Sequence, residues 1–97
     1  MRFKVQVGGR GGVPVDAVAA VLNVTVTEAQ GAGFATVFPC GVDRPNASSV
    51  NFVAGSTVAN GVIAKLGAGG VNVGKVCVFV SQPTHVLVDV AGYFSAP

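Results

Sequence analysis

Charged side chains are scarce in this chain of 97 residues, because Asp, Glu, Lys and Arg together make up only 10% of it. An average soluble domain has about 25%. The basic residues are scattered, with no aromatic platform beside them: Arg2, Lys4, Arg10, Arg44, Lys65 and Lys75. Nucleic-acid binding needs a concentrated basic stripe, so we expect no nucleic-acid partner. So few charges also suggest that neighbouring molecules cover part of the surface.

Long hydrophobic runs are absent as well. None approaches the ~20 residues that a helix needs to span a bilayer, so we expect no membrane partner. The composition nevertheless excludes disorder, because 51% of the residues are hydrophobic, and the length fits one domain over residues 1–97. The residues after Met1 alternate like a strand and lack the apolar stretch of a signal peptide, so we expect a module excised from a longer protein.

Groups that perform chemistry are few: the chain has one histidine and four acidic residues. His85 and Asp89 fall on one face of an expected strand, but about 13 Å apart at ~3.3 Å per residue, too far for a catalytic dyad. Ser48, Ser49 and Ser81 lie in no Gly-x-Ser-x-Gly elbow. We therefore expect no enzyme and no cofactor. Calcium needs more carboxylates and zinc more His or Cys ligands, so we also expect no metal.

Valine and a period of two dominate what is present, and both are typical of half-buried strands. We expect seven strands, at residues 2–7, 19–27, 34–38, 49–53, 57–66, 75–80 and 84–94. Alanines at 13–22 could form a short helix, but the Val-Thr alternation that follows favours a strand. We interpret Asn60-Gly61 as a bulge rather than a hairpin turn. The pattern predicts an all-β, antiparallel, jelly-roll-like sandwich of seven to eight strands.

Most phenylalanines fall at positions that favour the core. Phe34 and Phe38 alternate together in one expected strand, and Phe52 shares a face with Val50 in the next. Tyr93, near the C-terminus, could be a surface platform for a sugar, but we favour a side chain that seals the end of the sandwich.

Two cysteines lie on separate expected strands, Cys40 at the end of one and Cys77 inside another. This placement favours an inter-strand or inter-sheet disulfide, which would contribute about 3–4 kcal/mol in the chain-entropy model. Two buried free thiols are the alternative. A disulfide would indicate an oxidising compartment, and hence an extracellular or cell-surface protein.

Several polar residues interrupt apolar strands and form our candidate site: Asn23, Thr25, Asn51, Asn60, His85 and Asp89. They could form a buried polar network, because a buried amide must find hydrogen-bond partners. The same residue types could bind a carbohydrate, with the loops at 41–46 and 67–74 contributing. We favour the structural network and keep the ligand site as the alternative.

Six ordered runs together resemble a β-rich module that occurs, often in tandem, in secreted and cell-wall-associated proteins of high-GC Gram-positive bacteria. The runs are VLNVTVT at 21–27, GFATVFPCG at 33–41, SVNF at 49–52, TVAN at 57–60, VCV at 76–78 and THVLVDVAGYF at 84–94. The resemblance covers nearly the whole chain. It implies an accessory role beside peptidases, amidases and repeat domains, and no activity of the module itself.

In that family the module opens with a segment containing Leu-Asp-Thr-Arg, which this sequence lacks. A missing first strand would leave an unpaired sheet edge, and such an edge invites pairing with a neighbour. We therefore expect a non-catalytic structural or assembly module, a homo-oligomer or a partner of neighbouring modules. The alternative is a module that binds a glycan or the cell wall.

Overall fold

The computed structural model describes residues 1–95 and contains seven strands and one 3-10 helix. The strands are β1 (Arg2–Gln6), β2 (Ala17–Thr27), β3 (Gly33–Pro39), β4 (Val50–Phe52), β5 (Val58–Lys65), β6 (Lys75–Val80) and β7 (His85–Ser95). The short helix η1 (Gly70–Asn72) lies between β5 and β6. No helix in the described part of the chain is both long and apolar enough to span a membrane.

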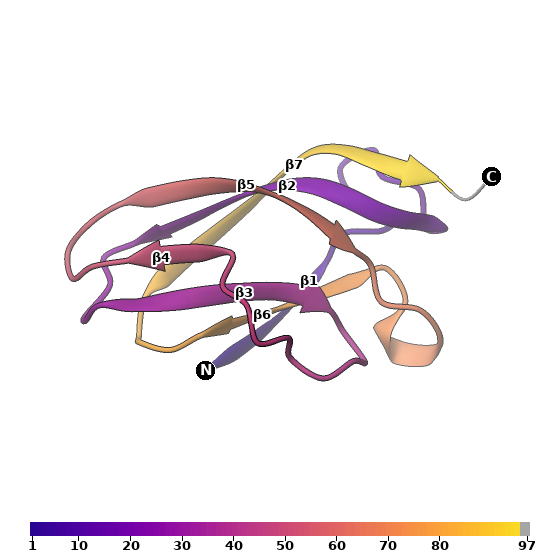
Figure 1. Ribbon diagram of the computed structural model, residues 1–97. Helices are drawn as coiled ribbons and strands as arrows, with labels where there is room; N and C mark the ends of the chain where they lie inside the picture. The colour runs from indigo at the N-terminus through magenta and orange to yellow at the C-terminus, as the bar shows by residue number, and fades with distance from the viewer. Residues whose placement is uncertain (96–97) are drawn as a thin grey trace.

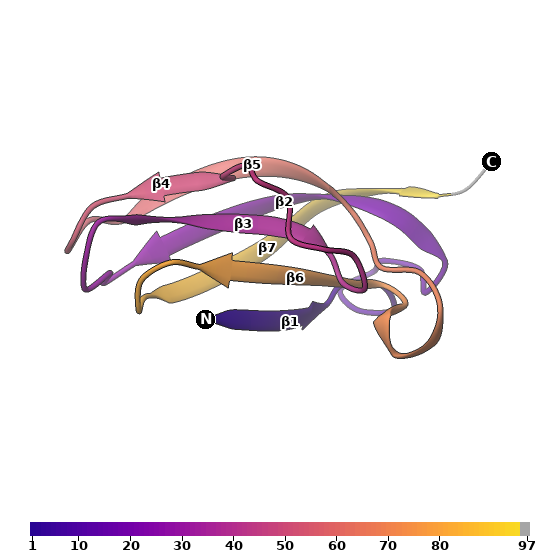
Figure 2. The same ribbon diagram turned by 60° about the horizontal axis from the view of Figure 1, so that its bottom comes forward.

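The strands form two antiparallel sheets that pack face to face (Figure 1). Sheet A has the order β1-β6-β3-β4, and sheet B has the order β5-β2-β7. Every connection except β3 to β4 passes from one sheet to the other. Figure 2 shows the N-terminus at the edge of sheet A, where β1 pairs with β6 alone. The predicted all-β sandwich is therefore confirmed.

The main core is built from the inward-facing residues of alternating strands. In β2, the buried positions Leu22, Val24 and Val26 alternate with outward-facing ones, as a sheet with one solvated face requires. They pack against valines from β6 in sheet A, of which Val76 and Val78 are fully buried. Valine suits these positions, because its stiff, branched side chain fits the pleated surface between two sheets.

The strand favoured over a short helix near residues 17–22 is confirmed: these residues belong to β2, since pairing with both neighbouring strands outweighs the alanine propensity. One sequence-based expectation needs correction. Asn60-Gly61 forms no bulge, because β5 pairs with β2 in an unbroken register. The register shifts lie between β2 and β7 instead, at Val21/Leu22 and at Ala17/Ala19.

Candidate functional site

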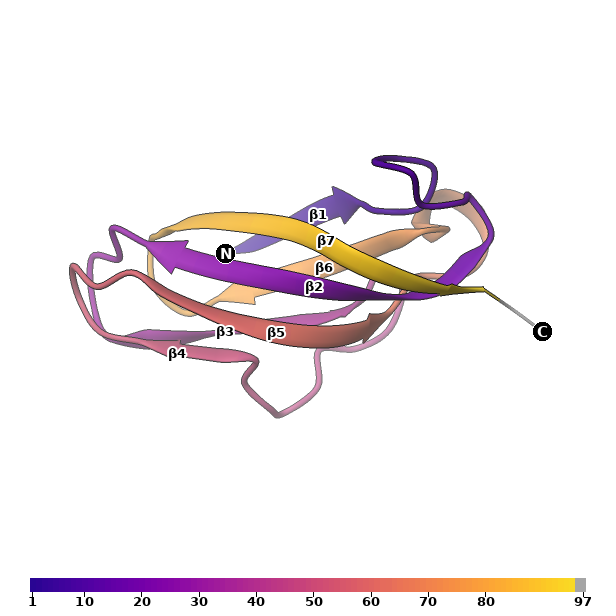
Figure 3. The same ribbon diagram turned by 90° about the horizontal axis from the view of Figure 1, so that it is seen from above.

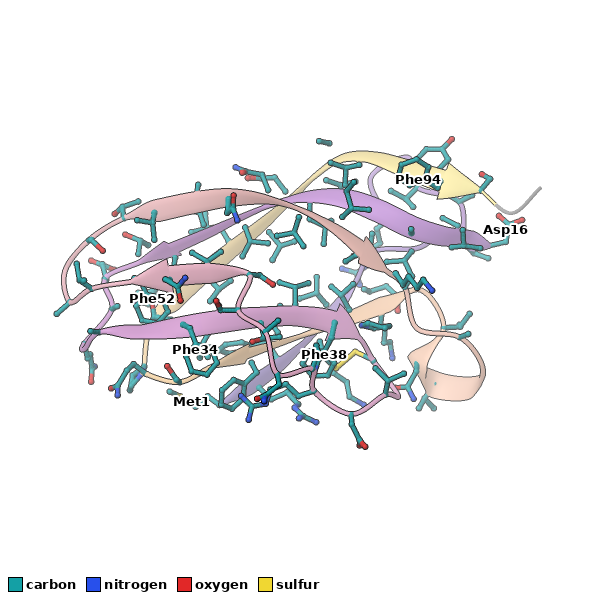
Figure 4. All side chains as sticks on the ribbon, in the orientation of Figure 1. Met1, Asp16, Phe34, Phe38, Phe52 and Phe94 are labelled. Atoms are coloured by element: carbon teal, nitrogen blue, oxygen red, sulfur yellow. A yellow bond between two sulfur atoms is a disulfide. The ribbon has the colours of Figure 1, made fainter. Side chains whose placement is uncertain are left out.

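The outer face of sheet A carries a second, smaller hydrophobic cluster. The disulfide predicted between Cys40 and Cys77 is present, with the Cα atoms 5.0 Å apart, and it joins the neighbouring strands β3 and β6. Phe38, directly opposite Cys77, is only 2% exposed and packs with the two cysteines rather than with the main core (Figure 4). Phe79 closes the cluster on one side. This aromatic and sulfur patch is shielded from water although no second sheet faces it.

The segment 41–49, between β3 and β4, covers this outer face. Its Arg44 guanidinium lies 3.9 Å from the ring centroid of Phe79, a cation–π contact. The buried Thr36 hydroxyl donates to the carbonyl of Ala47 at 2.8 Å, and the Ser49 hydroxyl accepts from the Val37 amide at 3.0 Å. The long loop is therefore fixed over the sheet by one cation–π contact and two side-chain hydrogen bonds.

The outer face of sheet B has no such cover. Val21 lies at its centre, directly opposite Ile63 of β5 on one side and Gly92 of β7 on the other. Ile63 is 71% exposed, and Leu87, further along β7, is 52% exposed. Several small residues share this face with them: Ala19, Ala59, Gly61 and Gly92. We call this surface, centred on Val21, Ile63 and Leu87, the apolar face.

Four of the six candidate polar residues lie on or beside the apolar face. Asn23 pairs directly with Asp89, and Thr25 pairs with Leu87. His85 pairs with Thr27 at the end of the strand, and its Nε2 atom lies 3.3 Å from Glu28 Oε2, with both side chains mostly exposed. The expected separation of His85 and Asp89 therefore holds, because each faces a different residue of β2. These polar groups are spread over the apolar face and do not converge in one site.

The remaining two candidates lie elsewhere, so the six residues do not form one buried network. Asn60 points inward from β5, and its amide donates to the Ser49 carbonyl at 2.7 Å, which joins the two sheets at one side of the sandwich. Asn51 is exposed on β4 beside the loop that covers sheet A. Asn23 and Asp89 are exposed as well. The predicted buried network is therefore wrong. A polar residue in an apolar strand can face solvent just as easily as it can face the core.

Two grooves are large enough to hold part of another molecule. One of about 310 Å³ lies beside the loop 41–49, and Phe34, Arg44, Ser48 and Asn51 are among the residues that line it. The other, of about 350 Å³, opens between β1 and β7 and is lined mainly by apolar side chains: Phe3, Val5, Val78, Thr84, His85, Val86 and Val88.

The second loop considered for glycan binding, 67–74, is fixed by backbone contacts. The Gly74 carbonyl accepts from the amides of Val7 and Gly8 at 3.0 and 2.9 Å. Gly67 has no room for a side chain, since a Cβ atom there would lie 2.2 Å from the Asn72 carbonyl oxygen. This segment closes one end of the sandwich.

Metal-ligating residues do not converge anywhere within residues 1–95: no group of three or more His, Cys, Asp or Glu residues could hold an ion. Comparison with known proteins yields no match to a protein-family model, to a curated protein or to a solved structure.

The sequence reading missed the two features that distinguish the outer faces of the sheets. Phe38 is buried as expected, but in the cluster on the outer face of sheet A rather than in the main core, and Phe34 on the same face is only half-buried. The signal was available: apolar residues occupy both faces of β3, as expected for a strand covered on both sides. No comparable signal marked Ile63, which follows the same apolar pattern but stays exposed.

Proposed function

We propose that this domain is a non-catalytic structural module of an extracellular or cell-surface assembly, and that it associates through its apolar face with copies of itself or with neighbouring modules. The observation that carries the proposal is the exposure of Ile63 and Leu87 on the same sheet surface as the half-buried Val21. Exposed apolar side chains that gather on one face of a soluble domain are typical of an interaction site.

The charges around the apolar face support this assignment. Lys65 lies beside Ala19 at one end of the face, and Asp89 lies beside Asn23 in the middle. The Glu28 carboxylate and the His85 imidazole lie at the other end. Charged and polar groups among the apolar side chains of an interface supply register and specificity.

The compartment rests on the disulfide between Cys40 and Cys77. Such a bond persists in oxidising surroundings and is rare in reducing ones, which is compatible with an extracellular protein. The similarity of six sequence runs to a module of secreted and cell-wall proteins supports the same location, and it remains a prediction.

Sedimentation velocity between 1 and 100 µM tests the proposed association. We expect the wild-type protein to form a reversible oligomer and the Ile63→Lys, Leu87→Lys double variant to remain monomeric. The matched control is Val42→Lys, Val71→Lys, which adds the same charge at exposed valines away from sheet B. A wild-type protein that stays monomeric at 100 µM and binds no neighbouring module would refute the proposal.

A carbohydrate or cell-wall ligand is the second candidate, and the groove beside the loop 41–49 favours it. Arg44 and Asn51 offer hydrogen-bond donors next to the half-buried ring of Phe34. Polar groups around an aromatic surface are a common means of binding small polar ligands. Retention on insoluble cell wall that Asn51→Ala abolishes and Asn23→Ala preserves would favour this function; equal retention of both variants would exclude the groove.

A further inference from the structure

Between Met1 and Ser95, the two sheets are linked along one side of the sandwich and not along the other. On the side of β4 and β5, the Asn60 amide of sheet B donates to the carbonyl of Ser49, the residue before β4, at 2.7 Å, and this hydrogen bond joins the two sheets. On the opposite side, β1 and β7 are the edge strands of the two sheets, and each pairs with a single neighbour. Figure 3 shows part of β1 extending past β7, with no strand of sheet B above it. The sandwich is therefore open along this side.

Side chains of the core are exposed at this opening. Phe3 lies opposite Val78, and Val88 lies opposite Val24, so both Phe3 and Val88 face inward between the sheets. Phe3 is nevertheless 42% exposed, and it lines the groove of about 350 Å³ together with Val5 and Val86. An apolar cavity of about 150 Å³ holds one benzene ring. The groove thus has room for two or more apolar side chains.

The strand order indicates what fits there. One strand added to the free edge of β7 would extend sheet B to β5-β2-β7-new, while sheet A remains β1-β6-β3-β4. If the new strand is counted first and every other strand moves up by one, the sheets become 6-3-8-1 and 2-7-4-5. This is the order of an eight-stranded jelly roll, built from two Greek keys. A strand at this edge would therefore give both sheets four strands and close the core.

The direction and end point of such a strand also follow from the fold. All pairings in the domain are antiparallel, so the added strand would run against β7 and end near His85. Met1 lies at the same place: its amino group donates to the Val80 carbonyl at 3.1 Å, and it lines a small depression with Thr84 and His85. A strand beside β7 would thus end next to Met1.

The chemistry of the edges favours β7 over β1 as the acceptor. Residues 85–95 contain no proline, lysine or arginine, the residues that commonly protect an edge strand from pairing. By contrast, β1 presents Arg2 and Lys4. A second copy that paired symmetrically along this side would bring its own basic β1, with Arg2 and Lys4, to the same side of the assembly.

We propose that the free edge of β7 binds one extended segment of a neighbouring module, antiparallel to β7, whose apolar side chains at alternate positions enter the groove beside Phe3 and Val88. Strand addition of this kind gains affinity from main-chain hydrogen bonds and specificity from side chains at alternate positions. The inference rests on the proposed assembly function for the source of the strand, but it concerns a different surface from the apolar face.

The strand β2 supplies a suitable probe, because it already pairs antiparallel with the other edge of β7 and directs Leu22, Val24 and Val26 inward. A peptide of residues 20–27 would be added in trans, and in a second protein it would be fused ahead of Met1 through a short Gly-Ser linker. The matched control carries Leu22→Ser, Val24→Ser and Val26→Ser in the added copy only. Hydrogen–deuterium exchange and thermal unfolding are the measurements.

We expect the fusion to be monomeric, to raise the Tm by at least about 5 °C and to slow amide exchange in β7 at least tenfold, while the control does neither. Unchanged exchange in β7, equal effects of the control, or protection of β5 instead would overturn the proposal. A further outcome would also overturn the proposal. If amide exchange in β7 of the unmodified protein slows at high protein concentration, and the peptide cannot compete with this protection, the edge binds a second copy. Self-association through the apolar face is measured on the unfused protein, with the Ile63→Lys, Leu87→Lys variant. Either proposal, association through the apolar face or strand addition at β7, can therefore fail without the other.

Discussion

The outer faces of both sheets carry apolar side chains, yet one is covered and the other is open. On sheet A, Arg2 lies over the Phe38 ring and Arg44 of the loop 41–49 lies over the Phe79 ring, whereas Ile63 and Leu87 on sheet B face solvent. The difference lies in chain connection: β3 and β4 are neighbours in the same sheet, and the long loop between them must return across that sheet. Within residues 1–95, no connection returns across sheet B. Apolar residues on sheet A therefore contribute to folding stability, and those on sheet B remain available for association.

Truncation of one phenylalanine on each sheet should give the largest difference in stability between the two outer faces. We expect Phe38→Ala to lower the free energy of unfolding by about 3–5 kcal/mol, as for a buried aromatic side chain in a core. Phe94, on β7, is 50% exposed, and Phe94→Ala should change the same quantity by less than about 0.5 kcal/mol. Urea denaturation measures both. Similar losses in the two variants would contradict the assignment of stability to the covered face.

Removal of the disulfide should have the next largest effect. Cys40 and Cys77 close a loop with a sequence separation of 37, so the Cys40→Ala, Cys77→Ala variant should lose about 3–4 kcal/mol of unfolding free energy. Urea denaturation of the variant, and of the reduced wild-type protein, gives the value. An unchanged unfolding midpoint would mean that the bond adds nothing to two strands that are already hydrogen-bonded.

The smallest effect concerns the attachment of the loop itself. Thr36→Val removes the hydrogen bond to the Ala47 carbonyl, which should cost about 1 kcal/mol and speed amide exchange in residues 41–49. Thr25→Val makes the same replacement on the open outer face of sheet B and is the matched control, expected to stay within about 0.5 kcal/mol. Exchange in the loop that is equally slow in both variants would show that Arg44 and Ser49 hold it without Thr36.

Much of the fold could be predicted from alternation alone. The period of two located all seven strands, and their bounds in the structure differ by at most two residues from those expected, as in Ala17–Thr27 against 19–27. The disulfide was favoured because Cys40 and Cys77 sit on separate strands of a small domain. Alternation does not say which face is inward, however, and for Asn23, Asn51 and Asp89 the buried assignment was wrong.

The sequence by itself determined an all-β domain with a valine core, a cysteine pair and few charged groups, because these follow from local period and composition. The tertiary structure decided which sheet face receives the loop 41–49, which one stays open, and where β7 is left with a free edge. Those properties depend on the order in which strands pair, and strand order joins residues distant in the chain that no local pattern connects.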